Sequence, residues 1–136
     1  MSPLMNSPMD SVVALVHRWM DAVNSGRLET VVGLYAEEAV LLPTFSPHAL
    51  RTPAARLAYF TMLTTRPGLR VSLHENTVRV QSAGGKVEIA SGIYRFHVEI
   101  DGEPLVFEAR FSLIVDVTQS RPILHHHSSQ LPRTLS

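Results

Sequence analysis

Three consecutive histidines near the end of the chain are the residues best suited to chemistry. They lie in the run Pro122-Ile-Leu-His-His-His-Ser-Ser-Gln-Leu-Pro132, which is short enough to form one strand. Because alternate side chains of a strand point to opposite faces, His125 and His127 would share one face and His126 the other. Imidazole groups titrate near neutral pH. A cavity lined by this strand would therefore receive two groups that change charge close to physiological pH.

The spacing of the histidines argues against a metal site. A catalytic zinc ion needs three protein ligands, and only His125 and His127 would share a face. His97, from an earlier segment, would have to approach as the third ligand. We therefore expect no bound metal ion, and we expect no organic cofactor.

Two arginines lie on the alternating segments that precede the histidines. Arg95 would share a face with His97 and oppose Tyr94, and Arg110 would share a face with Glu108. A buried arginine keeps its charge and presents a planar fork of donors, so an apolar cavity with two of them would favour a carboxylate or another organic anion. The alternative is that both arginines form structural ion pairs with acidic residues of neighbouring strands.

Three helices are predicted to come first among the elements that position these residues. Apolar residues recur at helical spacing from Val12 to Val23, between the cap signal Ser7-Pro8 and the breaker Asn24-Ser-Gly26. A second, shorter helix is predicted from about Leu28 to Tyr35. The pair Thr52-Pro53 repeats the cap-then-proline signal and opens the third helix.

A period of two dominates the rest of the chain. Asp101-Gly102 is typical of a tight hairpin. Four long strands joined by hairpins, after three helices that can cover one face, predict an α+β domain with three N-terminal helices packed on a curved antiparallel sheet. The predicted strands are a short one at Ala39–Leu42 and long ones at Leu69–Val80, Lys86–Ile100, Glu103–Val117 and the histidine run.

Length and composition limit the functions open to this chain. Its 136 residues predict a single domain over residues 1–136, and a hydrophobic content of 45% is sufficient for a core. Twelve basic side chains balance twelve acidic ones, so the broad positive surface of a nucleic-acid-binding or membrane-binding protein is not expected. There is no cysteine, and no apolar run approaches the ~18 residues that span a bilayer. We expect a soluble, cytoplasmic protein with no nucleic-acid or membrane partner.

Five strings carry a family resemblance. Trp19-Met-Asp-Ala-Val-Asn-Ser-Gly26 and Leu34-Tyr-Ala-Glu-Glu-Ala-Val40 resemble the nuclear-transport-factor-two-like (NTF2-like, or SnoaL-like) superfamily in general. Gly92-Ile-Tyr-Arg95, Ala109-Arg-Phe111 and Ile123-Leu-His-His-His-Ser-Ser129 resemble the association (hub) domain of calcium/calmodulin-dependent protein kinase II and its small bacterial stand-alone homologues. The resemblance implies an NTF2-like cone that self-associates and contains a pocket. No kinase signature occurs, so it implies no phosphoryl transfer.

The hub resemblance also implies which residues line the pocket. In that family, arginines that match Arg95 and Arg110 line a deep pocket together with a tyrosine that matches Tyr35 at the end of the second helix. Arg56 lies near a family histidine that also contributes. A third cationic position of the family corresponds to Ser128 here, which is a departure. The implied ligand-binding residues are Tyr35, Arg56, Arg95, Arg110, His125 and His127.

The same superfamily contains ketosteroid isomerase, whose catalytic groups are not matched here. Trp19 stands where that family has a tyrosine, and Leu42-Pro43 lies near its general-base aspartate. Ala109 and Arg110 lie near its protonated aspartate. Indole can only donate a hydrogen bond, and the other residues cannot supply a carboxylic acid. Proton abstraction next to a carbonyl by that arrangement is not expected.

Two function classes stay open on the sequence. In the first, the chain is a non-catalytic domain that forms a homodimer through its outer sheet face, or a larger ring, and binds a small organic anion. In the second, it is a SnoaL-like isomerase, cyclase or hydrolase that acts on a small hydrophobic carbonyl compound. That enzyme would use His125 or His127 as general acid/base and Arg110 as electrostatic stabiliser. The missing isomerase groups favour the first class.

Overall fold

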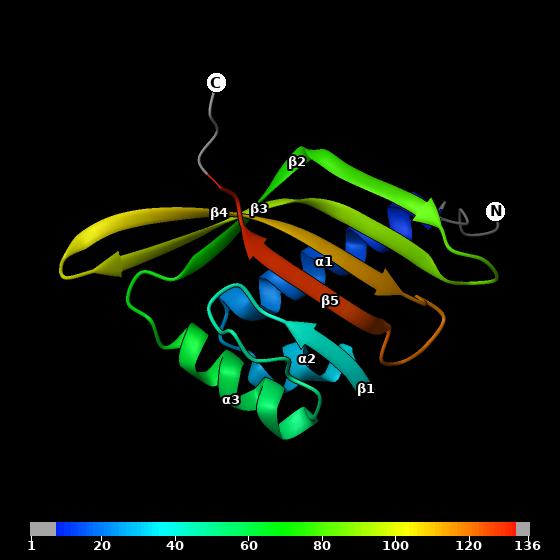
Figure 1. The fold of residues 1–136 in the computed structure, drawn as a ribbon, viewed down its shortest axis with the longest axis horizontal. Helices are drawn as coiled ribbons and strands as arrows, with labels where there is room; N and C mark the ends of the chain where they lie inside the picture. Colours follow the sequence, from blue (N-terminus) through cyan, green and yellow to red (C-terminus); the bar gives the residue numbers. More distant parts are fainter. Residues whose placement is uncertain (1–7, 133–136) are drawn as a thin grey trace, which may run out of the picture.

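The computed structural model describes residues 8–132 of the chain (Figure 1). Three helices pack on one five-stranded sheet, and most of its strand pairs are antiparallel, which confirms the predicted α+β fold. The elements in chain order are α1 (Pro8–Asn24), α2 (Leu28–Gly33), β1 (Tyr35–Leu42), α3 (Pro53–Thr64), β2 (Arg70–Ser82), β3 (Glu88–Ile100), β4 (Glu103–Val115) and β5 (Ile123–Gln130).

Helix α1 is amphipathic, and its apolar side supplies a large part of the core. Beyond the helix, Gly26 adopts a φ of 65°, a backbone conformation that glycine reaches at low cost. Asn24 holds the end of α1 on β2, because its side-chain amide exchanges two hydrogen bonds with the backbone of Val71. The predicted cap at Ser7 lies outside the described residues. The buried residues of this side include Val12, Leu15, Val16, Trp19 and Val23.

The boundary between α2 and β1 differs from the prediction. The helix ends at Gly33, and Tyr35 is the first residue of β1 instead of the last residue of the helix. The strand therefore begins four residues earlier than the predicted Ala39. The physical reason is a partner far along the chain: Tyr35 pairs with Ile123 of β5 in parallel register, and local periodicity carries no information about that pairing.

Helix α3 begins as predicted. The hydroxyl oxygen of Thr52 accepts a hydrogen bond from the Ala55 backbone N–H at 3.1 Å, and Pro53 is the first helical residue. Such a cap satisfies one of the free N–H groups of the first turn. The capped helix presents its buried side chains, Arg56, Tyr59, Phe60 and Leu63, to the interior.

The strand order in the sheet is β1-β5-β4-β3-β2, and only the β1–β5 pair is parallel. Helix α1 runs along one face of the sheet, while α2 and α3 lie beside β1 (Figure 1). The hairpin that joins β3 and β4 turns at Asp101 and Gly102, both with positive φ, as the sequence predicts. This hairpin extends beyond the helices (Figure 1).

The two faces of the sheet have different characters. We call the face that carries the buried side chains the inner face and the opposite one the outer face. Along β3, Tyr94, Phe96 and Val98 are buried on the inner face, and Arg95 and His97 alternate with them on the outer face. Strand β4 has the same alternation, with Ala109, Phe111, Leu113 and Val115 buried.

Strand β5 places the middle histidine in the interior. Its register on β4 shifts at one point, because Val115 pairs with Ile123 whereas Ile114 pairs with His125. Leu124 is the extra residue of this β-bulge. Beyond the bulge, His126 is only 2% exposed and faces inward.

Candidate functional site

Four buried side chains form one continuous polar chain across the interior. Trp19 on α1 donates a hydrogen bond from Nε1 to the Tyr35 hydroxyl at 3.0 Å. That hydroxyl lies 2.7 Å from Nδ1 of His126, and Nε2 of His126 lies 3.1 Å from the Tyr94 hydroxyl. Each of the four residues is at most 3% exposed. We call Trp19, Tyr35, His126 and Tyr94 the interior relay.

The interior relay has a direction, which follows from the donor-only character of indole. The Tyr35 oxygen accepts from Trp19, so its own proton has Nδ1 of His126 as its acceptor. His126 then carries its proton on Nε2 and donates it to the Tyr94 hydroxyl. The network assigns this tautomer, because the other one would leave the Tyr35 proton buried without an acceptor, at a cost of ~1–3 kcal/mol.

The interior relay is uncharged at neutral pH. Burial, and then the neighbouring His125 and His127, lower the pKa of His126 to about 3. Burial raises the pKa of both the Tyr35 and the Tyr94 phenol above the ordinary value. The relay therefore consists of neutral groups that donate and accept hydrogen bonds without net charge.

Arg56 lies beside the interior relay, but β1 occupies its guanidinium. The side chain is fully buried, with its guanidinium carbon 5.6 Å from the centre of the Tyr35 ring. Its two terminal nitrogens donate to the backbone carbonyls of Ala36, Glu37 and Ala39 at 2.6–3.0 Å. These carbonyls lie where β1 departs from regular pairing with β5. Arg56 thus replaces missing ladder hydrogen bonds, and its charge is committed to the backbone.

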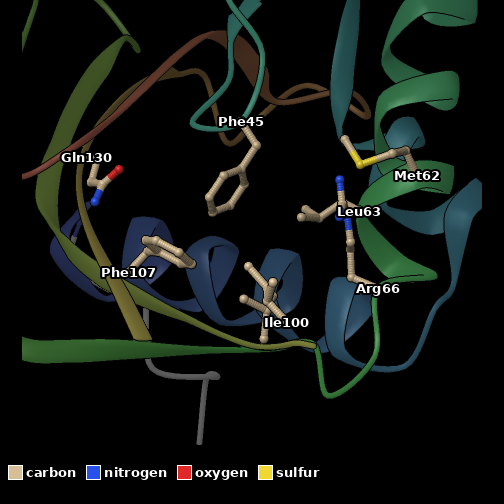
Figure 2. Close-up of a pocket in the computed structure, with 8 residues that line it drawn as sticks. Phe45, Met62, Leu63, Arg66, Ile100, Phe107 and Gln130 are labelled. Atoms are coloured by element: carbon tan, nitrogen blue, oxygen red, sulfur yellow. The ribbon is translucent and has the colours of Figure 1, made fainter. Parts of the chain in front are cut away.

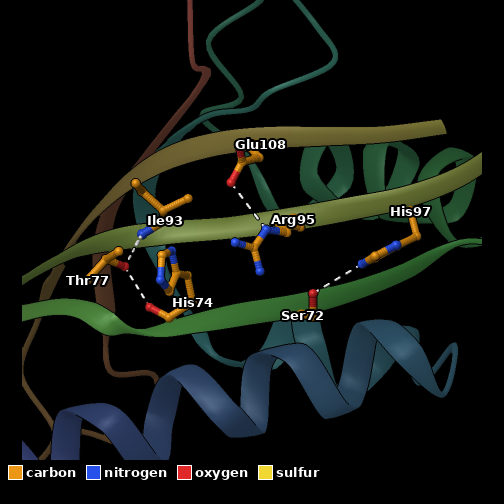
Figure 3. Close-up of polar contacts among 7 residues, drawn as sticks. All are labelled: Ser72, His74, Thr77, Ile93, Arg95, His97 and Glu108. Carbon is orange, nitrogen blue, oxygen red and sulfur yellow. Dashed lines mark hydrogen bonds and ion pairs between the residues drawn. The ribbon is translucent and has the colours of Figure 1, made fainter.

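Arg95 and Arg110 do not line the interior, so this part of the predicted pocket is wrong. Both lie on the outer face. Figure 3 shows Arg95 there, and its Nε pairs with Glu108 at 3.2 Å. The Arg95 side chain is 38% exposed, and Arg110 is exposed between Ile93 and Ser129 on the neighbouring strands. The structural ion pair that the sequence left open is confirmed for Arg95. Anion binding by either arginine on this face stays a prediction.

His125 and His127 also lie on the outer face, so the two-histidine cavity is not formed. His125 sits between Val40 and Ile114, and His127 sits between Leu42 and Ser112. The prediction that these two histidines share a face is correct. Their shared face is the one opposite the core, because the bulge in β5 directs His126 inward.

An apolar cavity of about 200 Å³ lies between α3 and the β3–β4 hairpin. We call it the mouth cavity. Phe45, Met62 and Leu63 project into it from the side of the loop and α3, and Phe107 and Ile100 face them from the sheet (Figure 2). Its polar groups are Arg66 and Gln130, both exposed at the rim. The Arg66 side chain forms no ion pair with any described residue.

A second, much smaller cavity adjoins the interior relay. It measures about 10 Å³, roughly the space of one water molecule. Thr44 and Ser128, whose hydroxyls are hydrogen-bonded to each other, line it together with Tyr94. We call it the inner cavity. The ring of Phe45 lines the mouth cavity. It packs edge-on against Phe96, with the two ring centres 5.1 Å apart. Leu63 lines both cavities.

The sequence interpretation missed several residues of these two cavities. The alternation placed Tyr94 on the face opposite Arg95, whereas the family resemblance implied a pocket on the face of Arg95. Phe45 and Thr44 lie on an irregular loop that no periodicity describes. Arg66 lies two residues beyond the end of α3, outside any periodic segment. Of the predicted residues, the structure brings Tyr35 and Arg56 together and separates them from the other four.

Two further observations bear on the predicted partners. Within residues 8–132, no three or more His, Asp or Glu side chains are grouped closely enough to hold a metal ion. None of the described helices has the length and apolar character to cross a membrane. The expectations of no metal ion and no nucleic-acid partner stay predictions.

Comparison with known proteins places this geometry in a family. The model of the calcium/calmodulin dependent protein kinase II association domain matches residues 9–132. A solved Xanthomonas campestris protein, named for that association domain, superposes with a TM-score of 0.81 at 27% identity, covering 92% of this chain and 89% of its own. No curated protein matches the sequence.

Two more distant solved structures share the fold. A ketosteroid isomerase-like protein from Erwinia carotovora atroseptica has a TM-score of 0.78 at 11% identity, over 95% of this chain and 100% of that one. An NTF2-like protein with a cystatin-like fold from Novosphingobium aromaticivorans has a TM-score of 0.74 at 14% identity, over 92% and 82%. At these identities the similarity shows the NTF2-like fold alone.

Proposed function

Because the chain belongs to the calcium/calmodulin-dependent protein kinase II association domain family, we propose that it is a non-catalytic, self-associating domain that binds a small organic acid in the mouth cavity. The proposed ligand binding rests on one observation: Arg66 is a cation at the rim of an apolar cavity. Arg66 has no acidic partner among the described residues, and six apolar side chains line the space below it. A ligand with an apolar body and one carboxylate would match both features.

Benzoate and benzamide test this proposal, because they share an apolar ring and differ in charge. Benzoate should bind more tightly by up to about fivefold in calorimetry, since an exposed ion pair contributes ~0.2–1 kcal/mol. Arg66→Gln should abolish the difference. Arg110→Gln is the matched control, because it removes an exposed arginine from the outer face. Equal binding of acid and amide to the wild-type protein contradicts the proposal, and loss of the difference in Arg110→Gln alone would move the site to the outer face.

The outer sheet face supports the self-association part of the proposal. Half-buried apolar side chains, among them Ile89, Ile93 and Ile114, lie on it in adjacent rows. All the described helices lie on the other side of the sheet or beside β1 (Figure 1). A two-fold contact would bury these rows, and it could bring Arg110 of one copy to Glu108 of the next. A homodimer is the simplest assembly of this kind, and a larger ring is compatible with it.

Light scattering at micromolar concentration tests the assembly. Ile93→Asp should give a folded monomer, because it places a charge at the centre of the proposed contact. Leu57→Asp is the control, since Leu57 is an exposed apolar residue on α3, 43% accessible, away from this face. The same mass for both variants and wild type would contradict assembly through the outer face.

The enzyme alternative loses the groups on which it was based. His125, His127 and Arg110 lie on the outer face, away from both cavities. The residues that line the mouth and inner cavities include no carboxylate. His126 has both ring nitrogens in hydrogen bonds and a pKa of about 3, so it is a poor general base near neutral pH. We therefore favour binding over catalysis.

A further inference from the structure

The apolar lining of the mouth cavity continues onto the inner face of the β3–β4 hairpin. Val98, Ile100 and Phe107 line the cavity. Leu105 pairs with Val98 across the hairpin, and directly paired side chains of neighbouring strands lie on the same face. Ile100 is 42% exposed and Leu105 is 39% exposed. We call these four residues the hairpin strip, which begins inside the cavity and ends on two side chains that are open to water.

The exposed end of the hairpin strip lies beyond the described helices. The β3–β4 hairpin extends past them (Figure 1), and α3 contributes Met62 and Leu63 to the cavity at the base of the hairpin. Apolar surface that leaves water gains free energy roughly in proportion to its area. A ligand body that only fills the cavity would leave Ile100 and Leu105 in water, whereas a longer apolar body would cover them as well.

The charge at this site lies at one side of the cavity. Figure 2 shows Arg66 and Gln130 on opposite sides of it. The Gln130 amide is neutral and exposed to water, so it needs no partner from a ligand, and the described lining includes no carboxylate. A ligand with one anionic end and an otherwise apolar length matches this distribution of charge.

We propose that the ligand is an unbranched fatty acid, whose carboxylate pairs with Arg66 and whose alkyl chain fills the mouth cavity and covers the hairpin strip. This inference rests on the proposed function and names the class of organic acid. The free carboxylate is part of the inference, because an ester or amide of the same chain offers no charge to Arg66. The alkyl chain is the other part, because each methylene group that leaves water adds a similar increment to the affinity.

Calorimetry with the even-numbered acids from butanoate to decanoate tests the inference. Affinity should rise by about two- to fourfold for each added methylene group, the gain expected when the group leaves water partly or completely. Octanoate should bind more tightly than octanamide by the factor that separates benzoate from benzamide, because the same carboxylate meets Arg66.

Leu105→Ser tests the contribution of the exposed end of the hairpin strip. Decanoate should bind this variant about three- to fivefold more weakly, since the exposed part of the leucine side chain no longer supplies apolar surface to the ligand. Ile100→Ser is the second variant and should act in the same direction, should Leu105→Ser fail to fold. Val106→Ser is the matched control, because Val106 is the next residue of β4, is 54% exposed and pairs with His97 on the outer face. It should keep the wild-type affinity for decanoate.

The outcomes separate the two proposals. Equal affinity for all acids from butanoate to decanoate, each still bound more tightly than its amide, would overturn the fatty-acid inference and leave the proposed function intact. Wild-type decanoate affinity in both Leu105→Ser and Ile100→Ser would also overturn it, and a smaller mass of these variants in light scattering would then assign the strip to a contact between copies. Acids that bind no more tightly than amides would overturn the proposed function, and the fatty-acid inference with it.

Discussion

Nδ1 of His126 lies 2.7 Å from the hydroxyl oxygen of Tyr35, although the two residues are 91 positions apart in the sequence. This contact joins β5 to the start of β1 inside the core. Both residues are at most 2% exposed. Because buried polar groups must find partners, the contact couples the position of the middle histidine to the position at which β1 begins.

Tyr35→Phe should destabilise the fold by ~2–4 kcal/mol, because it removes the acceptor of the Trp19 indole N–H and the donor to His126 together. Tyr94→Phe removes one partner of His126, so we expect the smaller loss of ~1–3 kcal/mol. Urea unfolding followed by tryptophan fluorescence measures both. A Tyr35→Phe variant as stable as wild type would show that the interior relay contributes little to folding.

His126 should make stability depend on pH. Its pKa is about 3 in the folded chain, against an ordinary value of 6.5, so the unfolded chain binds the extra proton between these values. Stability due to this group is complete above about pH 6.5 and is lost as pH falls toward 3, by up to ~1.4 kcal/mol per pH unit. His126→Phe should flatten the curve of unfolding free energy against pH in this window.

The control for the pH experiment is His125→Gln, which removes a neighbouring histidine from the outer face. This variant should keep most of the wild-type slope. If His125→Gln and His126→Phe flatten the curve equally, the buried imidazole is not the group responsible.

Arg56→Lys should cost about 2 kcal/mol or more, although it preserves the charge. One ammonium group cannot reproduce the fork that reaches the carbonyls of three β1 residues. Arg95→Lys is the matched control, because the Arg95–Glu108 pair is largely exposed and a surface ion pair contributes at most ~1 kcal/mol. Equal unfolding free energies for the two variants in urea would refute the role of Arg56 in holding β1.

Gly92→Ala should destabilise the sheet by ~1–3 kcal/mol through overpacking. A Cβ at this position would lie 2.9 Å from the ring of Phe111, whereas a Cβ on Gly33 would meet nothing within 4 Å. Gly33→Ala is therefore the control, and it should be neutral or slightly stabilising. The melting temperatures of both variants in thermal unfolding measure this difference. Phe111→Leu should partly restore the stability of the Gly92→Ala variant if the ring is the obstacle.

Much of the fold follows from local patterns in the sequence. The cap at Thr52, the hairpin at Asp101-Gly102 and the alternation of Tyr94 with Arg95 each depend on residues close together in the chain, and each appears as predicted. The predicted start of β1 was wrong, because Tyr35 pairs with Ile123 of β5. A strand can be anticipated from its own residues, but its partner cannot.

For the candidate site, local sequence patterns specify the residue types and their alternation: three histidines on one strand, and arginines alternating with aromatic residues. Packing against distant elements selects which face becomes the interior. Helix α1 packs against one side of the sheet, α2 and α3 lie beside β1, and a one-residue bulge at Leu124 accompanies the inward position of His126. The outer pair of histidines and both strand arginines consequently face away from the core. Side-chain alternation specifies two faces, whereas burial against distant elements selects one of them.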